Sequence, residues 1–421
     1  MVAKVINDVK QNRGFYIWMA FLLAVFGVAG VAAILVWTRG LEVTGLSNEV
    51  PWGLWITVDL SAVALGSGSF AVAGLVYLFG AKRFAAVSRV ALLIGFLADT
   101  GTALVLLLDL GRPDNFYHPI IYWNTKSLLW VITWSVILYI TILLIELAPV
   151  LTESKLFARW PIVHRIGEEI HKATPVAAFM GVVISIIHLS ATGATYGILR
   201  GRPVWFDPAM PVIFLVSGIF AGISFLIMVI VVTSWVMRRR LVDPNLLDQL
   251  ARIAGWVGVT CGIIRVIDLS ANHYFSYKPF LGESINLLYN MTPYSLALTL
   301  GEFAFGLIIP LAIFFNPTVR VRFRNLVLAG VGATTGLLLC RWNVTLTGLV
   351  ATVSYSPSAP SINFFSYFPT WVEWAAVAGV LAYAGMVYTL AVRFLPIFGA
   401  EGEEEETELA AERHHAPVVA A

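Results

Sequence analysis

Long uninterrupted apolar runs recur along this 421-residue chain, and they constrain its fold more than any other feature. About 18 consecutive apolar residues suffice for a helix to cross a bilayer, where a helix satisfies its own backbone polar groups. The sequence is 59% hydrophobic and 12% charged, against roughly 45–50% and 25% in an average soluble domain. Ten spanning segments are predicted, at residues 14–38, 54–80, 87–110, 126–149, 173–199, 209–236, 249–273, 293–316, 325–343 and 371–395.

The predicted fold class is an all-α integral membrane protein with about ten transmembrane helices. An outer-membrane barrel is excluded because the apolar runs are continuous and do not alternate. Helices two to five and six to nine are predicted to form two four-helix bundles, flanked by helices one and ten. Residues 66–74 resemble 217–222, and residues 108–117 resemble 267–275, which suggests a parallel duplication. Small-residue packing motifs also recur by chance in helix bundles, so this similarity can arise without duplication.

The predicted domain organisation follows from these segments. Residues 1–13 form an N-terminal segment, which precedes a retained first helix and its outer loop at 14–53. The apolar run that begins at residue 14 is too long for a signal peptide. The first bundle is expected at 54–199 and the second at 209–343. The last helix covers 371–395, and 396–421 form an acidic tail.

Lysine and arginine gather in the N-terminal segment, in alternate loops and in the C-terminal tail, which predicts the orientation. Positive charge is retained on the cytoplasmic side of a membrane. Both termini are therefore predicted to be cytoplasmic, in the inner membrane of a bacterium. Only a few basic residues fall at the opposite, outer ends of the helices, namely Arg39, Arg112, Lys126, Arg200, Arg202, Lys278 and Arg341.

The predicted outer loops are rich in aromatic residues. Interfacial belts of tryptophan and tyrosine explain rings near helix ends. Their concentration on one side is also compatible with a surface that docks a partner. The residues include Trp52, Trp55, Phe116, Tyr117, Tyr122, Trp123, Trp205, Phe206, Tyr274, Phe275, Phe364 and Phe365.

Ionisable residues inside the predicted helices are candidate functional groups, because such groups are costly at membrane depth. Most fall in the outer half of their helices. Asp99 lies near the middle of helix three, and Glu146 lies near the cytoplasmic end of helix four. The full set is Asp59, Asp99, Asp109, Glu146, His188, Arg265, Asp268, Glu302 and Glu373.

His188 stands in a polar stripe on helix five. Ser185, Thr192 and Thr195 recur at helical spacing around it and share its face. An imidazole beside hydroxyls can bind a carbonyl or phenol and relay a proton. The alternative is an interhelical hydrogen bond that only holds two helices together, which stabilises by roughly 1 kcal/mol.

Arg265 and Asp268 are spaced to pair along helix seven, and Glu302 lies on helix eight. A buried pair of this kind is structural as often as functional. The acids and bases of five helices nevertheless converge on one outer-half region, which single structural pairs do not explain.

Three classes of membrane protein compete for this pattern. A b-type cytochrome needs two axial histidines per haem inside the bundle, and only His188 lies well inside. Cys261 and Cys340 lack metal-ligand spacing, so we expect neither haem nor an iron–sulfur cluster in this chain. A secondary transporter remains the alternative, although no matching pair of broken helices is evident. A quinone-reactive subunit that receives electrons from another chain fits best.

Five motifs occur in order at residues 48–59, 109–112, 145–149, 188–193 and 367–373. Taken together, they are similar to those of the NrfD/polysulfide-reductase family. The ten-helix form, as in hydrogenase-2, the Qrc menaquinone reductase and the Dsr complex, is the nearest match. The resemblance covers nearly the whole chain from helix two to helix ten.

This resemblance implies a membrane subunit without cofactors of its own. It would work in a complex with a periplasmic four-cluster iron–sulfur subunit and exchange electrons with menaquinone near the periplasmic face. Proton translocation is a separate hypothesis, based on the deep residues Asp99 and Glu146. Two positions depart from the family pattern: Ala191 replaces a serine of the His-x-Ser-Ser-x-Gly motif, and Pro113 follows Arg112. Thr192 is a candidate to replace the missing hydroxyl.

The predicted quinone site lies in the first bundle, between helices two to five, near the outer surface. Asp59, Asp109, Arg112 and His188 are assigned to the quinone head group and its protons, and Trp52 and Tyr117 to the wall of the site. The residues of a predicted proton route are Asp99, Glu146, Arg265, Asp268 and Glu302.

Overall fold

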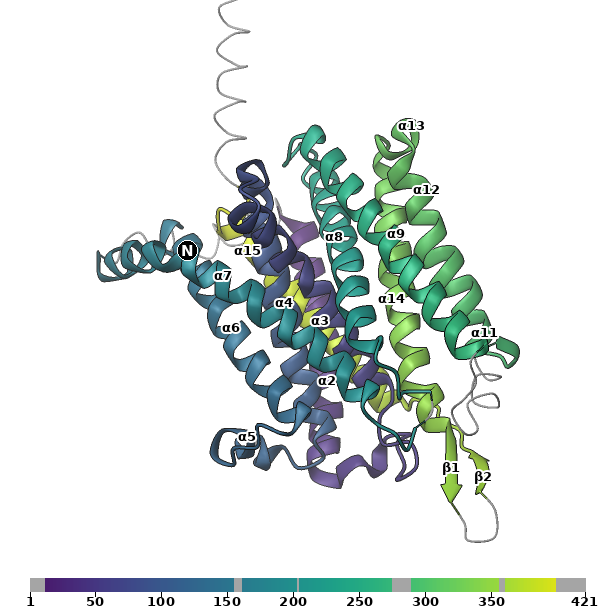
Figure 1. Ribbon diagram of the computed structural model, residues 1–421. Coiled ribbons are helices and arrows are strands. Elements are labelled where there is room, and N and C mark those ends of the chain that lie inside the picture. The colour runs from purple at the N-terminus through teal and green to yellow at the C-terminus, as the bar shows by residue number, and fades with distance from the viewer. Residues whose placement is uncertain (1–11, 155–160, 203, 275–288, 356–359, 399–421) are drawn as a thin grey trace, which may run out of the picture.

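The computed structural model describes residues 12–154, 161–202, 204–274, 289–355 and 360–398, and these are mostly helical (Figure 1). Ten spans in this part of the chain are long and apolar enough to cross a membrane, which confirms the predicted fold class. The predicted segments 1–13 and 396–421 lie mostly outside the described residues. The spans are Arg13–Val43, Leu54–Leu78, Lys82–Asp109, Leu128–Glu153, Lys172–Gly197, Met210–Val236, Pro244–Tyr274, Tyr294–Phe315, Phe323–Val350 and Trp371–Phe394.

Individual helices and turns divide these spans further. The first four spans contain α2 (Arg13–Arg39), η1 (Gly40–Val43), α3 (Leu54–Ala73), the π-helical η2 (Gly74–Leu78), η3 (Lys82–Val87), α4 (Ser88–Asp109) and α6 (Leu128–Glu153). Between α4 and α6 lie η4 (Pro113–Asn115) and α5 (His118–Ile121). The later elements are α7 (Pro161–Gly197), α8 (Met210–Val236), α9 (Pro244–Tyr274), α11 (Tyr294–Leu296), the π-helical η5 (Ala297–Ile308), α12 (Ile309–Phe315), α13 (Pro317–Arg320), α14 (Phe323–Val350) and α15 (Trp371–Phe394).

The central helices pack as two rings of four. In the first ring, α3 packs on α4 and α7, and α6 packs on α4 and α7. In the second ring, α8 packs on α9 and α14, while η5 and α12 pack on α14 and α12 reaches α9 (Figure 1). These contacts follow the predicted grouping of helices, and the proposed duplication stays a prediction.

The two rings meet where α3 crosses α8 at a pair of glycines. A Cβ added to Gly68 would lie 2.5 Å from the carbonyl oxygen of Gly222. A Cβ at Gly222 would in turn reach the Ser67 hydroxyl oxygen at 2.7 Å. Small residues allow this approach, which is how membrane helices gain packing energy without a hydrophobic driving force.

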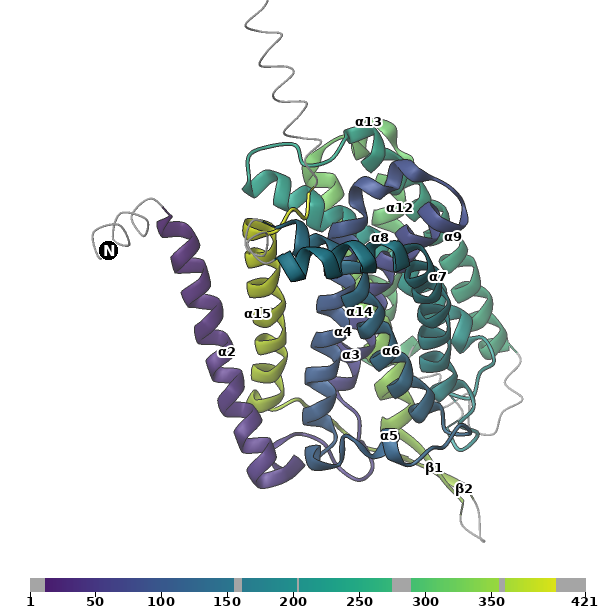
Figure 2. The same ribbon diagram turned by 90° about the vertical axis from the view of Figure 1, so that its left-hand side faces the viewer.

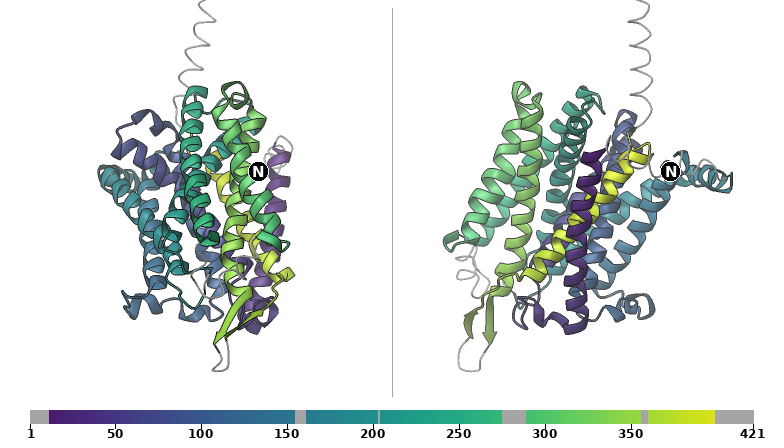
Figure 3. Two further views of the ribbon diagram at one scale, coloured as in Figure 1. Left: turned by 45° about the vertical axis from the view of Figure 1, so that its right-hand side comes forward. Right: turned by 180° about the vertical axis from the view of Figure 1, so that it is seen from behind.

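α2 and α15 lie side by side at the edge of the molecule (Figures 2 and 3). The Trp18 indole donates a hydrogen bond to the Thr389 hydroxyl at 3.2 Å, and Gly379 packs against Ala29. Most other side chains of α2 are apolar and exposed, as expected for a helix that faces lipid.

A β-hairpin projects from one end of the molecule (Figure 1). Its antiparallel strands, β1 (Ala351–Tyr355) and β2 (Pro360–Phe364), pair Ala351 with Phe364. The sequence analysis did not predict it. We call this end the hairpin side and the opposite end, where α2 begins and α15 ends, the terminal side (Figure 3).

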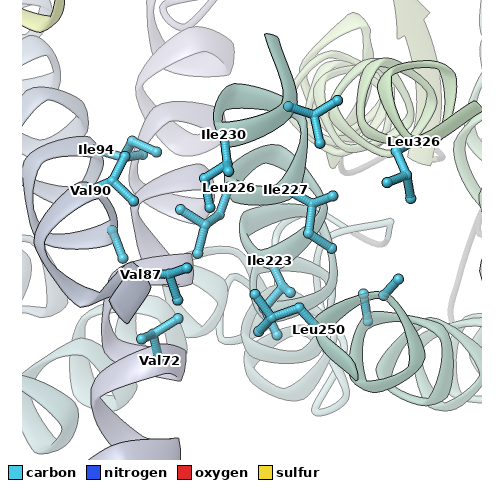
Figure 4. Close-up of a cluster of buried hydrophobic side chains, with 14 of the residues drawn as sticks. Val72, Val87, Val90, Ile94, Ile223, Leu226, Ile227, Ile230, Leu250 and Leu326 are labelled. Carbon is cyan, nitrogen blue, oxygen red and sulfur yellow. The ribbon is translucent and has the colours of Figure 1, made fainter. Parts of the chain in front are cut away.

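The basic loops predicted to be cytoplasmic connect helices on the terminal side, for example at η3, at the α8–α9 connection and at α13 (Figure 2). Buried apolar side chains fill the same side of the bundle. Ile223, Ile227 and Ile230 of α8 interlock there with Val90 of α4 and Leu250 of α9 (Figure 4). This apolar cluster separates most buried polar groups, which lie toward the hairpin side, from the terminal side.

α14 corrects one predicted boundary. The segment was expected to end at residue 343, with Arg341 near an outer helix end, but the helix runs to Val350. Arg341 and Asn343 are both completely buried. Surrounding helices enclose this polar pair, so a drop in hydropathy marked a buried site and not the end of the helix.

Candidate functional site

Three aspartates follow one another along the interface of α3 and α4, and we call them the acid column. Asp59 of α3 and Asp99 of α4 are buried, and Asp109 ends α4 on the hairpin side. The carboxyl group of Asp59 lies close enough to those of Asp99 and Asp109 for electrostatic interaction. The helices approach closely here, since a Cβ at Gly66 would lie 3.3 Å from an Asp99 carboxyl oxygen.

The acid column has few hydrogen-bond partners. Within the described residues, neither carboxyl oxygen of Asp99 has one, nor has Oδ1 of Asp59 or of Asp109. Thr102 donates from its hydroxyl to the Asp59 backbone oxygen at 3.4 Å. Buried polar atoms of native proteins are rarely left without a partner, and a ligand or an ordered water is the usual explanation.

His188 of α7 faces the column. Its Nδ1 lies 3.9 Å from Oδ1 of Asp99, and both side chains are almost fully buried. The predicted hydroxyl stripe does not surround the imidazole as expected. Thr192 and Thr195 donate to carbonyl oxygens one turn back in their own helix, the usual back-bonding of threonine within a helix. The Ser185 hydroxyl has no hydrogen-bond partner within the described residues.

Beyond Asp99, a tyrosine extends the polar groups toward the terminal side. The hydroxyl groups of Tyr139 and Ser69 are 2.6 Å apart, and both residues are buried. Tyr139 lies within electrostatic reach of both Asp99 and Glu146. Glu146 is buried against α7, 3.7 Å from the position of a Cβ at Gly181. The sequence analysis missed Tyr139, because an aromatic residue in an apolar helix is expected to pack in the hydrophobic core.

On the hairpin side, Glu373 ties three segments together. Its carboxylate accepts hydrogen bonds from the Tyr367 hydroxyl at 2.5 Å, the Gly45 amide at 2.7 Å and the Thr370 amide at 2.9 Å. With Thr370 it forms the capping box that starts α15. Burial, together with the neighbouring Glu373 carboxylate, raises the pKa of the Tyr367 phenol. Glu373 therefore has a structural role, because its hydrogen bonds hold these segments together.

The remaining predicted site residues lie apart from His188. Arg112 is exposed and pairs with Asp114 at 3.6 Å. Tyr117 is exposed beside His118. Trp52 stacks on Trp205, with ring centroids 5.9 Å apart, in a cluster between the two rings. The structure thus groups Asp59, Asp99, Asp109 and His188, and it places Arg112 and Tyr117 at the surface.

Arg341 is the most unusual buried cation of the described residues. Its guanidinium lies 3.7 Å from the centre of the Phe214 ring, and Nη2 donates to the Ser217 hydroxyl at 2.8 Å. Nε and Nη1 have no hydrogen-bond partner within the described part of the chain. The neighbouring Tyr196 lies within electrostatic reach of both Arg341 and Asp59. The guanidinium therefore lies inside the second ring, against α8, with Tyr196 of the first ring nearby.

The second ring contains a different polar group, which we call the ion-pair cluster. Arg265 of α9 donates from Nε to Glu302 of η5 at 2.7 Å and from Nη1 to Asp268 at 2.9 Å. The Asn272 amide bridges the Asp268 and Asp207 carboxylates at 3.0 and 2.6 Å. The predicted Arg265–Asp268 pair is thus observed, and Glu302 joins it from another helix.

Two cavities flank Arg265. The first, with about 30 Å³ of space accessible to water, opens on the hairpin side and includes Asp268, Asn272, Tyr289 and Asn343 in its lining. The second, with about 40 Å³ of space accessible to water, lies near mid-membrane. Its lining includes Ser217, Phe220, Cys261, Glu302, Phe303, Leu307, Leu337 and Cys340. Of the two groups, the ion-pair cluster is therefore the one that these cavities reach.

Among the described residues, no cluster of three or more histidine, cysteine, aspartate or glutamate side chains is arranged to hold a metal ion. The acid column, by contrast, suits proton exchange. Intramembrane carboxyl and imidazole groups that face a bundle interior commonly form proton relays and ligand pathways.

Comparison with known proteins identifies the class to which this chain belongs. The sequence model of the family described as "Polysulphide reductase, NrfD" matches residues 42–353. This match covers more than half of the chain and includes both rings. The chain belongs to the NrfD family of integral membrane proteins.

Individual relatives agree with this membership. The "Menaquinone reductase, integral membrane subunit" of Nitratidesulfovibrio vulgaris is 29% identical, over 92% of this chain and 93% of its own length. The "Hdr-like menaquinol oxidoreductase integral membrane subunit" of Archaeoglobus fulgidus is 25% identical, over 94% and 96%. The "Probable Ni/Fe-hydrogenase 2 b-type cytochrome subunit" of Escherichia coli is 24% identical, over 85% and 86%. These names do not favour a transporter.

Proposed function

We propose that this chain is the quinone-binding membrane subunit of a respiratory oxidoreductase complex, with menaquinone as its substrate. The observation that carries the proposal is the acid column with His188 beside Asp99. Two relatives whose names include menaquinone or menaquinol support the substrate class. The quinone would exchange electrons with a periplasmic four-cluster iron–sulfur subunit, because we infer no redox group in this chain.

The proposal gives individual residues of the acid column, and His188 beside it, a role in binding the quinone and moving its protons. Reduction of a quinone to a quinol takes up two electrons and two protons, and oxidation of the quinol releases both. In the proposed site Asp59 and His188 hydrogen-bond the head group and exchange protons with it. Asp109 connects the site with the hairpin side, and Trp52 forms part of an aromatic wall with Trp205.

Two residues that were predicted to belong to the site are exposed, and we propose a different role for them. Arg112 and Tyr117 belong to the hairpin-side surface, where the iron–sulfur subunit would dock. That surface would face the periplasm, with both termini in the cytoplasm, because the basic loops lie on the terminal side.

Proton translocation is the second element of the proposal. A route from Asp99 through Tyr139 and Ser69 to Glu146 would lead from the column toward the terminal side. The first ring supplies all the polar groups of this route.

Binding of a menaquinol analogue to the intact purified complex tests the site. Fluorescence quenching of 2-heptyl-4-hydroxyquinoline N-oxide would be titrated in wild type, His188→Ala and Asp59→Asn. Loss of one charge-assisted hydrogen bond is expected to weaken binding by about 1.5–3 kcal/mol, or tenfold or more. His118→Ala and Asp114→Asn, at the surface, are the matched controls. Unchanged affinity in both site variants would refute the assignment.

A further inference from the structure

Five exposed arginines gather at the terminal-side ends of α8 and α14, and we call them the arginine patch. Other basic residues on this side pair with carboxylates, as Arg89 does with Glu153 at 2.8 Å and Arg252 with Asp248 at 3.0 Å. None of the five has an ion-pair partner within the described residues. The patch consists of Arg238, Arg239, Arg240, Arg322 and Arg324.

α8 and α14 run antiparallel and stay in register up to the patch. Three contacts join them in order toward the terminal side: Arg341 donates to the Ser217 hydroxyl, Gly330 packs against Met228, and the ring centroids of Trp235 and Phe323 lie 6.1 Å apart. Each step along α8 is matched by an equal step back along α14. The arginines that follow α8 therefore lie beside those that begin α14.

The acids near the patch already have partners within the protein. Arg320 of α13 is buried, where it pairs with Asp248 of α9 and donates to the Phe314 carbonyl oxygen at 2.5 Å. Asp243, in the connection from α8 to α9, accepts a hydrogen bond from the Asn245 amide at 2.9 Å. The connection thus sets one aspartate against five arginines, and the patch has a surplus of positive charge.

Next to the patch, toward mid-membrane, an apolar strip of α8 is exposed. Met228, Val232 and Trp235 recur at i, i+4 and i+7 and so share one face. The side chains of Val232 and Trp235 are 36% and 68% exposed. Met228 contacts α14 on one side of the strip, and on the other the Thr233 hydroxyl lies 2.7 Å from the Tyr388 hydroxyl of α15. The strip is therefore the floor of a groove between α14 and α15.

α14 adds a second apolar face to this groove. Arg324, Val327 and Val331 recur at i, i+3 and i+7, and Arg324 and Val331 are exposed. Because α8 and α14 are antiparallel and in register, this face turns to the same side of the helix pair as the strip of α8. The groove thus has arginines at its terminal-side end and apolar side chains along its length.

This order of groups matches that of an anionic phospholipid. Guanidinium groups bind phosphate oxygens through paired N–H donors, and basic groups between membrane helices bind lipid head groups that carry more than one negative charge. An exposed tryptophan beside them is typical of the depth at which head groups lie. Several arginines without partners fit two phosphate groups better than one.

We propose that the arginine patch binds the head group of a phospholipid with two phosphate groups, such as cardiolipin, and that the acyl chains lie in the groove between α14 and α15. This site is separate from the acid column. The inference depends neither on quinone binding nor on which side of the membrane the terminal side faces.

Cardiolipin binding to the intact purified complex tests the head-group contacts. Native mass spectrometry would follow the bound fraction as cardiolipin is added to the complex in detergent. Arg239→Gln/Arg324→Gln is expected to bind at least about tenfold more weakly, because two charges that attract the phosphates are lost. Lys82→Gln/Arg83→Gln removes the same charge from exposed positions of η3 and should bind as wild type does. Arg239→Lys/Arg324→Lys, which keeps both charges, should retain most of the affinity.

Two exposed tryptophans provide a matched test of the acyl-chain contacts. Trp235 lies in the groove beside Phe323, whereas Trp256 of α9 is 66% exposed and lies 5.3 Å from Phe315 between ring centroids. We expect Trp235→Ala to weaken cardiolipin binding severalfold and Trp256→Ala to leave it unchanged. Equal effects of the two substitutions would remove the groove from the site.

The acidic segment that follows α15 is the alternative occupant of the patch. One full-chain variant that combines Glu403→Gln, Glu404→Gln, Glu405→Gln and Glu406→Gln distinguishes the two. Cardiolipin affinity equal to that of wild type supports the lipid, whereas binding that becomes measurable only in this variant would assign the patch to the acidic segment. Equal affinities of the Arg239→Gln/Arg324→Gln and η3 double variants would also overturn the inference, as would phosphatidylcholine binding as tightly as cardiolipin.

Discussion

The acid column and the ion-pair cluster occupy similar depths in the two rings, yet they satisfy their charges in opposite ways. In the column, one of the three aspartates, Asp99, lies 3.9 Å from His188, and several carboxyl oxygens have no hydrogen-bond partner within the described residues. In the cluster, Arg265 holds Glu302 and Asp268 by direct hydrogen bonds. The first arrangement leaves its groups available to a ligand or proton, and the second fixes them in place.

This difference separates two roles that the sequence had merged. Breaking a satisfied buried ion pair leaves a charge without a partner, which is strongly destabilising. Altering a carboxyl group that makes few protein contacts leaves packing intact and changes chemistry. Substitutions in the cluster should therefore affect stability first, and substitutions in the column should affect turnover first.

The largest expected effect on stability is that of Arg265→Leu. Removing the guanidinium leaves Glu302 and Asp268 as neighbouring buried carboxylates, at an expected cost of about 3–5 kcal/mol. Thermal unfolding of the purified complex, followed by the amount of chain still folded, measures it. A melting temperature equal to that of wild type would contradict the description of the cluster as a structural ion pair.

The column should respond differently to an isosteric change. Asp99→Asn removes no hydrogen bond described within the chain, so we expect a stability change below about 1 kcal/mol. Quinone-dependent turnover of the intact complex should fall at least tenfold, since an amide cannot exchange the proton. Thr334→Val, which also alters a buried group without a described partner, is the matched control. Equal turnover in the two variants would remove Asp99 from the proton chemistry.

Glu373 should behave like the cluster although it lies near the column. Glu373→Ala removes acceptors for Tyr367, Gly45 and Thr370 and the capping box of α15. We expect a loss of about 2–3 kcal/mol, of which the cap contributes roughly 1 kcal/mol. Thermal unfolding with Thr370→Ala as a partial variant measures both parts. A loss of turnover without any loss of stability would show that Glu373 belongs to the site chemistry.

The smallest expected structural effect is that of Tyr139→Phe. It removes the hydroxyl bonded to Ser69, and such interhelical bonds contribute about 0.6 kcal/mol on average. If the route toward Glu146 operates, proton uptake from the terminal side should slow in vesicles that contain the complex. Tyr383→Phe, which loses a hydroxyl contact with Thr100 outside the column, is the control. Equal proton uptake in both variants would exclude this route.

The sequence was sufficient to predict the helical fold, because a 20-residue apolar run has few other structures in a bilayer. It also predicted the Arg265–Asp268 pair, whose partners are three residues apart in one helix. It could not show that Glu302 completes this pair from another helix. Nor could it show that Arg341 lies inside a longer α14, because hydropathy does not distinguish a helix end from a buried polar contact.

The candidate site was predictable in part for the same reason. Asp59, Asp99 and His188 stood out because ionisable residues are rare inside membrane helices. Tyr139 and Tyr196 did not, since an aromatic residue in an apolar helix reads as core. The exposure of Arg112 depends on the turn at Gly111, which has a φ of 64° and directs the chain out of α4.

The central claim is that the quinone head group lies against the acid column. A structure of the purified complex, prepared with an excess of a short-chain naphthoquinone, tests it most directly. The account predicts head-group density between α3, α4 and α7, within hydrogen-bond distance of Asp59 or His188. Head-group density found only outside this region, with the column contacted by protein and water alone, would contradict it.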